Sequence, residues 1–327
     1  RALAELALAR ASLGQANEEE SYASRLERTQ IELTLGWMLF RQGHTEAAQT
    51  AAWAALQAAE ELADLNAIAA ACNLLGGLAY TTGNLAQAVA LSERSLALRR
   101  EIGDPAGMAA AYSNLGVLAV AQGQWDQAIE HFERALAMRR EAGDLAGEAI
   151  VLSNLGQIMK DRGDFTQAVA YFTASLHAAE RAESVYQQVV NRSNLGHLKA
   201  LQGDGEGAVQ ALSESIRQAR AIDAQELVAE AHWMLAEAQL VRGDIPAAEA
   251  AAQHALELAG EIDHWRHAAH ARRMLGRAAL RSGECLKAAR QLRAALRIAW
   301  RLGDKLVLAM VYDEWADLRA RSTRPER

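Results

Sequence analysis

The chain of 327 residues has few of the residues that interrupt helices or cross-link a fold. It contains 3 prolines and 2 cysteines, and only 5% of its residues are aromatic. So little proline leaves long helices unbroken, and Cys72 and Cys285 are too few for a disulfide framework. Because Ala, Leu, Glu, Arg and Gln favour helices, the composition predicts an all-α protein.

The sequence also lacks the long apolar run of a membrane span and the short motifs of common enzymes. No uninterrupted apolar stretch reaches the roughly 18 residues that cross a bilayer, and we expect no signal peptide. G-x-x-x-x-G-K-[ST], H-E-x-x-H, G-x-S-x-G and C-x-x-C are all absent. We therefore expect a cytoplasmic protein that is not an enzyme and uses no metal or cofactor.

What the sequence does have is a strict period of 40 residues, marked by three series of small residues. The first series is Gly43, Gly83, Gly123, Gly163, Gly203, Gly243 and Gly283. The second is Gly36, Gly76, Gly116, Gly156, Gly196, Ala236 and Gly276. The third is Ala48, Ala88, Ala128, Ala168, Ala208, Ala248 and Ala288. Such a period indicates a tandem array that presents a long surface.

Each repeat has the pattern of two helices joined by a tight turn. In the third repeat, Asp104 is a suitable N-cap and Pro105 suits the first helical position. Apolar residues at helical spacing lead to Gly123, which we expect to end the first helix. A second amphipathic stretch then runs to Gly143. The repeat therefore predicts an antiparallel pair of helices of about 17 residues each, which cross closely at Gly116.

The Ser-Asn-Leu-Gly strings, the alanine series and the small-Leu pairs of the second helices resemble the tetratricopeptide repeat (TPR). The 40-residue spacing resembles its long variant, found in Leu-Gly-Asn (Pins)-type adaptors, kinesin light chains and the C-terminal arrays of bacterial STAND-type regulators. The proline usual near the end of the second helix is absent, and the longer second helix accounts for this. The resemblance implies a right-handed superhelical solenoid whose first helices line a concave groove.

The repeats divide the chain into four parts. Residues 1–24 are expected to be a truncated helix of a preceding repeat plus a linker, and residues 25–304 to be seven TPR-like helix pairs. Residues 305–320 are expected to form a C-terminal capping helix, and 321–327 a disordered tail. Because the opening residues have the pattern of a helix interior, we expect a piece of a longer protein. An apolar surface at that end would allow a homodimer.

Three asparagines stand at the same position of consecutive repeats, each preceded by a serine. The pairs are Ser113–Asn114, Ser153–Asn154 and Ser193–Asn194. An asparagine amide offers one donor and one acceptor group, which suits the backbone of an extended peptide. Helices packed about 10 Å apart match about three residues of extended chain. The series therefore predicts a peptide-binding ladder; inherited repeat similarity or hydrogen bonding between helices is the alternative.

Gln157, Lys160 and His197 flank this ladder and are candidate residues for selecting the peptide sequence. Related arrays hold a C-terminal carboxylate with a clamp of lysines, asparagines and an arginine. Here the corresponding positions carry Ser and, at the next inner position, Val117, Gln157 or His197. We therefore do not expect capture of a C-terminal carboxylate.

A basic segment lies near the C-terminal end, in a chain whose net charge is −7. Residues 265–303 contain ten basic residues and a single acidic one, Glu284. Arg273, Arg277 and Arg281 are spaced to lie on one helix face, a secondary basic face that could bind an acidic partner. The alternative is a solvated face that offsets an acidic array. Nucleic acid is not expected, because the array is acidic overall and the basic stripe has few aromatics.

His264, His267 and His270 are spaced by three residues, as helical metal ligands can be. We expect no acidic or cysteine ligand to accompany them, and Arg266 and its neighbours would repel a cation. We therefore expect no metal site at these histidines.

The sequence as a whole favours a non-catalytic scaffold or sensor arm that recognises an extended protein or peptide segment in its groove. A small-molecule-sensing domain of a STAND-type ATPase or transcription regulator is the alternative. A purely structural or oligomerising array is the third possibility.

Overall fold

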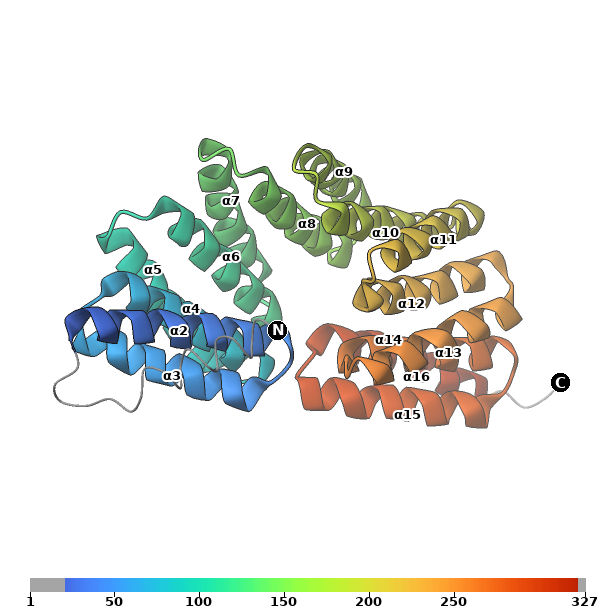
Figure 1. Cartoon of the computed structure of the whole chain (residues 1–327). Helices are drawn as coiled ribbons and strands as arrows, with labels where there is room; N and C mark the ends of the chain where they lie inside the picture. Colours follow the sequence, from blue (N-terminus) through green and yellow to red (C-terminus); the bar gives the residue numbers. More distant parts are fainter. Residues whose placement is uncertain (1–20, 323–327) are drawn as a thin grey trace. The chain divides into compact units, whose positions relative to one another are not determined.

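The computed structural model describes residues 21–322, and all regular structure in that part of the chain is helical (Figure 1). The N-terminal helices are α2 (Tyr22–Arg41), α3 (Thr45–Glu61), α4 (Leu65–Thr81), α5 (Leu85–Glu101), α6 (Pro105–Gln122) and α7 (Trp125–Glu141). The remaining helices are α8 (Leu145–Asp161), α9 (Phe165–Arg181), α10 (Val185–Leu201), α11 (Gly205–Ala221), α12 (Gln225–Arg242), α13 (Ile245–Glu261), α14 (Trp265–Arg281), α15 (Cys285–Leu302) and α16 (Lys305–Ser322).

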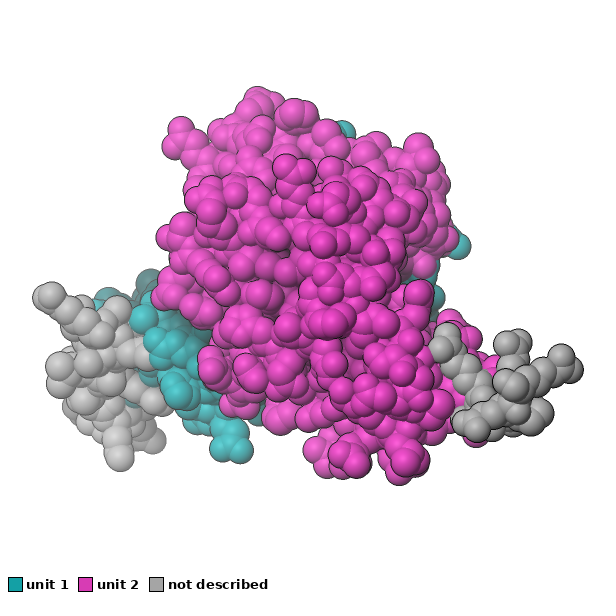
Figure 2. Space-filling model, turned by 90° about the vertical axis from the view of Figure 1, so that its right-hand side faces the viewer, with its two compact units in different colours: residues 1–143 teal, residues 144–327 magenta. Residues whose placement is uncertain are grey.

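Consecutive helices form antiparallel pairs, so the all-α solenoid fold predicted from the sequence is confirmed. The chain divides into two compact units, residues 1–143 and residues 144–327, which Figure 2 colours separately. The first unit contains α2–α7 and the second contains α8–α16. The expected truncated helix lies outside the described residues, as does most of the expected tail; α16 extends to Ser322.

The helix ends form where the small residues and caps of the repeat predict them. The side chain of Asp104 accepts a hydrogen bond of 2.9 Å from the backbone N–H of Gly107, which caps α6. Pro105 is the first residue of that helix. Gly123 ends it in the left-handed conformation, with φ of 77°, a conformation that costs other residues about 1–2 kcal/mol. The turn between two helices of a pair therefore depends on this glycine.

The second glycine series and the alanine series mark the close crossing of the two helices in each pair. A Cβ atom placed on Gly116 would lie 2.7 Å from the Phe132 ring, and one on Gly156 would lie 2.8 Å from the Phe172 ring. Every alanine of the third series is at most 1% exposed. The small residues are thus the contact points at which one helix rests on the next.

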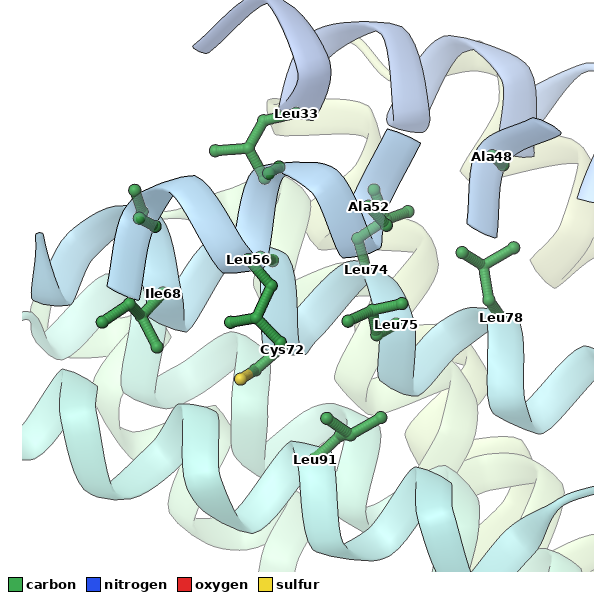
Figure 3. Close-up of a cluster of buried hydrophobic side chains, with 14 residues drawn as sticks. Leu33, Ala48, Ala52, Leu56, Ile68, Cys72, Leu74, Leu75, Leu78 and Leu91 are labelled. Atoms are coloured by element: carbon green, nitrogen blue, oxygen red, sulfur yellow. The ribbon is translucent and has the colours of Figure 1, made fainter. Parts of the chain in front are cut away.

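The hydrophobic core is distributed along each stack, because every pair buries its apolar side against the next pair. Figure 3 shows one such cluster, formed by side chains of α2–α5 that include Leu33, Leu56, Leu74 and Leu91. Cys72 lies in this cluster as a free thiol, and burial raises its pKa. Packing of this kind gives each unit its stability without a single central core.

The even-numbered helices form the inner layer of each unit. In the second unit α8 packs against α10, α10 against α12, α12 against α14, and α14 against α16. The odd-numbered helices pack chiefly on their even-numbered neighbours. Within each unit, the even-numbered helices therefore contact one another, and we call the side that they share the inner face. Within residues 21–322, none of the helices is both long and apolar enough to traverse a bilayer.

Candidate functional site

The three asparagines of the predicted ladder have different environments. Asn114 on α6 donates a hydrogen bond of 2.5 Å to the side-chain oxygen of Asn73 on α4, so its amide joins two inner helices. Asn154 on α8 is half-buried and Asn194 on α10 is buried, and neither amide has a hydrogen-bond partner among the described residues. Asn114 therefore forms a hydrogen bond between helices, which was the alternative to a peptide-binding role. The side-chain amides of Asn154 and Asn194 remain able to bond to a partner.

The serines before the asparagines face the helix packing. Ser113 donates to the carbonyl of Ala109, one turn earlier in the same helix. Ser153 and Ser193 are buried, and the Ser193 hydroxyl has no hydrogen-bond partner among residues 21–322. Ser113 is thus satisfied within its own helix, whereas Ser153 and Ser193 lie in the packing between helices.

Lys160, at the end of α8, is a half-buried ammonium group with no ion pair or hydrogen bond in the described part of the chain. Burial lowers its pKa, against the opposing pull of Asp161 and Glu230. Glu230 on α12 is likewise half-buried, and burial raises its pKa. Gln157 is different, because its amide donates to Asp161 at 2.8 Å. Lys160 is therefore the charged group that this face leaves available to an anion.

His197 belongs to a buried network of charges centred on Glu237. The Nε2 atom of His197 lies 3.0 Å from a Glu237 carboxylate oxygen, and Arg273 and Arg277 contact the same carboxylate. Arg273 also lies 3.2 Å from Glu314. Burial opposes ionisation, but the hydrogen bond from His197 and the two arginines hold the pKa of Glu237 well below its usual range. The network joins α10, α12, α14 and α16.

This network pairs two of the three arginines that the sequence predicts as a secondary basic face. Arg273 is 6% exposed and Arg277 is partly buried, and their charges are paired with Glu237 and Glu314. Only Arg281 of the three is exposed. The sequence prediction missed the pairing because the acidic partners lie far away in the chain. Glu237 stands one repeat before Arg277, so a comparison of in-phase positions could have found it.

Two histidines enclose Trp233 on the inner side of α12. The His270 ring stacks on the indole with centroids 4.3 Å apart, and the His197 ring meets it edge-on at 5.1 Å. Burial lowers the pKa of both histidines. The Nε1 atom of Trp233 is buried and has no hydrogen-bond partner within residues 21–322. His270 is thus used in packing and lies apart from the His264–His267 pair, whose rings stack on each other.

The fold and this polar inner layer define a helical-repeat protein. Three family models described as the tetratricopeptide repeat match the sequence, over residues 68–102, 107–181 and 229–254. The chain therefore carries tetratricopeptide repeats, as its residue pattern predicts. No curated protein matches the sequence.

Several solved structures have a similar fold at low sequence identity. The Rap conjugation gene regulator of the plasmid pLS20, in complex with the Phr* peptide, gives a TM-score of 0.72 at 16% identity, covering 91% of this chain and 83% of that chain. NprR in complex with its cognate peptide NprX gives 0.62 at 14% identity, covering 92% and 86%. A STAND protein with a tetratricopeptide repeat sensor from Pyrococcus horikoshii gives 0.60 at 13% identity, covering 94% of this chain and 45% of that chain.

Proposed function

We propose that this protein is a non-catalytic scaffold or sensor arm that binds an extended peptide segment of a partner on the inner face of its second unit. The observation that carries the proposal is the set of unpaired polar groups on adjacent inner helices. Asn154, Lys160 and Asn194 have no hydrogen-bond partners among the described residues. Polar groups in such positions are usually paired, so their availability needs an explanation.

A peptide backbone supplies what these groups lack. Asn154 and Asn194 stand at equivalent positions of helices that pack against each other. Packed helix axes lie about 10 Å apart, which is about three residues of extended chain. Each amide can then donate to a peptide carbonyl and accept from a peptide N–H group. This contact is independent of the peptide's sequence.

Lys160 would add the preference for an anion. An ammonium group that is half-buried and unpaired gains more from a carboxylate than an exposed one does, because water screens it less. An acidic side chain of the partner, two or three residues from the asparagine contacts, is the group that we expect there. The peptide complexes of the similar Rap and NprR structures support a peptide as the partner class.

Selection from a random peptide display library tests the proposal, with binding of the selected peptides then measured by fluorescence anisotropy. The double variant Asn154→Ala/Asn194→Ala should weaken binding roughly tenfold or more, since it removes several hydrogen bonds. Lys160→Met keeps the side-chain length and should weaken the binding of acidic peptides by about tenfold to a hundredfold. Asn114→Ala is the matched control, because its amide already serves Asn73, and should bind as the parent does.

Two results would overturn the peptide proposal: no enriched peptide, or peptides that bind the parent and all three variants equally. The first result would favour the second candidate, a small-molecule-sensing arm of a STAND-type ATPase. The similar fold of the Pyrococcus horikoshii sensor array supports that candidate. A metabolite screen by thermal shift would test it: a ligand should raise the Tm of the parent and have less effect on Lys160→Met.

A further inference from the structure

The start of α14 and the start of α12 bring together three side chains that can bind a metal ion. Glu226 lies in the first turn of α12, His264 is the N-cap of α14, and His267 lies in its first turn. Successive inner helices run in the same direction and pack against each other, so their N-terminal ends lie side by side. Glu226 stands 38 positions before His264 in the chain, so a search for ligands close to the histidines in sequence does not find it.

The three groups lie close to the geometry of a metal site. One ligand atom of each lies within 4.8 Å of the other two. The Nε2 atom of His264 is 3.5 Å from a Glu226 carboxylate oxygen. Two metal–ligand bonds of about 2.1 Å at a tetrahedral angle separate the ligand atoms by about 3.4 Å. The His264–Glu226 pair therefore already has the required spacing. His267 needs to approach by at most about 1.4 Å, since its ligand atom lies within 4.8 Å of the other two.

A second observation points to a ligand at this place. His267 is 7% exposed, and its Nε2 atom is buried with no hydrogen-bond partner among residues 21–322. A buried ring nitrogen without a partner is unfavourable. Coordination of a metal ion through this nitrogen would satisfy it.

Two of the positive charges that argue against a metal site, those of Arg266 and Arg273, are paired with carboxylates. Arg266 forms an ion pair of 2.8 Å with Asp304. Arg272 donates to Gln291 at 3.0 Å, and Arg273 is held by Glu237 and Glu314. The negative charge nearest the two histidines is Glu226, whose side chain is 53% exposed. A cation at this site would therefore lie directly against the Glu226 carboxylate.

We propose that Glu226, His264 and His267 form a site for a divalent metal ion of the zinc class, with one coordination position left to water or an external ligand. Two imidazoles and one carboxylate suit Zn²⁺, Co²⁺, Ni²⁺ or Cu²⁺, whereas Mg²⁺ and Ca²⁺ prefer oxygen ligands. The bound ion would link the starts of two successive inner helices.

Binding requires a small rearrangement of the two histidines. Their rings stack with centroids 3.8 Å apart and planes 17° from parallel, so the rings must turn before their in-plane lone pairs converge on one ion. The Nδ1 atom of His264 accepts a long hydrogen bond of 3.4 Å from the His267 backbone N–H. Coordination through Nε2 moves the ring proton to Nδ1 and replaces this weak bond.

Titration of the whole chain with Co²⁺, followed by its visible absorption and by displacement with Zn²⁺, tests the proposal. We expect one ion per chain. Glu226→Gln and His267→Phe, which keep the side-chain shape, should weaken binding by at least about tenfold. In a parallel thermal scan, Zn²⁺ should raise the Tm of the parent clearly more than that of Glu226→Gln.

His254→Asn is the matched control. The His232 and His254 rings also lie close together, at 4.4 Å, but both contact Arg220. Among the described residues they belong to no three-residue cluster with a carboxylate. This variant should bind Co²⁺ as the parent does. Absence of stoichiometric binding would overturn the proposal. Equal affinity of the parent, Glu226→Gln and His267→Phe would also overturn it, provided that circular dichroism shows equal helix content.

Discussion

Individual residues on the inner face act mainly through partners one repeat away. His197 contacts Glu237, and Glu237 contacts Arg277, each pair 40 positions apart. Residues at the same phase of neighbouring inner helices face each other across the helix contact. Whether a charged side chain on this face is paired therefore depends on the residues at the same position of the repeats before and after it.

Glu237→Gln should destabilise the protein by roughly 3 kcal/mol, because it leaves two guanidinium groups and one histidine with fewer charged partners in a buried network. Urea unfolding measures the change. Glu214→Gln is the control, since Glu214 pairs with Arg217 on an exposed surface and its loss should have no measurable effect. Equal midpoints for parent and Glu237→Gln would show that the network contributes little.

At the scale of the helix pair, the small residues determine how closely two helices approach. Gly116 lies in the middle of α6, where glycine has low helix propensity, yet the Phe132 ring leaves no room for a Cβ atom. Gly260, near the end of α13, has nothing within 4 Å of the same position. The two glycines therefore separate the packing effect from the propensity effect.

Gly116→Ala should lower stability by about 1–3 kcal/mol, since overpacking outweighs the gain in helix propensity. Gly260→Ala should raise it by up to about 1 kcal/mol for the propensity reason alone. Thermal unfolding followed by circular dichroism compares the two. A stabilised Gly116→Ala variant would mean that Phe132 moves aside at little cost.

The helices and their ends could be predicted from the sequence because they depend on local chemistry. Asp104 as cap, Gly123 as turn and Gly116 as crossing point each act on residues a few positions away or within the same pair. The candidate site was predicted only in part. The bond from Asn114 to Asn73 and the place of Glu226 beside His264 depend on which side chains of two helices meet, and periodicity alone does not decide that.

At the scale of the whole molecule, the buried histidines of the second unit make stability depend on pH. Burial lowers the pKa of His197 and His270, so both stay neutral in the folded chain at pH values where the unfolded chain binds protons. Stability is therefore lost as the pH falls below about 6.5. Glu314 opposes this trend, because burial raises its pKa to about 7 and its folded form takes up a proton over part of the same range.

The Tm should fall between pH 7.5 and pH 5.5, since each such histidine contributes a loss of roughly 1.4 kcal/mol per pH unit below its unfolded pKa. His270→Phe keeps a ring on Trp233 without the titrating nitrogens and should reduce this pH dependence. Thermal scans at both pH values measure the two slopes. A Tm that rises on acidification would show that Glu314 outweighs the histidines.

The in-phase contacts between inner helices also constrain how such a gene can change in length. Insertion of a single residue into an inner helix turns every later side chain of that helix by about 100° and separates it from its partners in the next repeat. Duplication or loss of all 40 residues leaves every later contact in phase. Unequal recombination between repeats, more than small insertions, is therefore the route by which this array can grow or shrink while its inner face stays continuous.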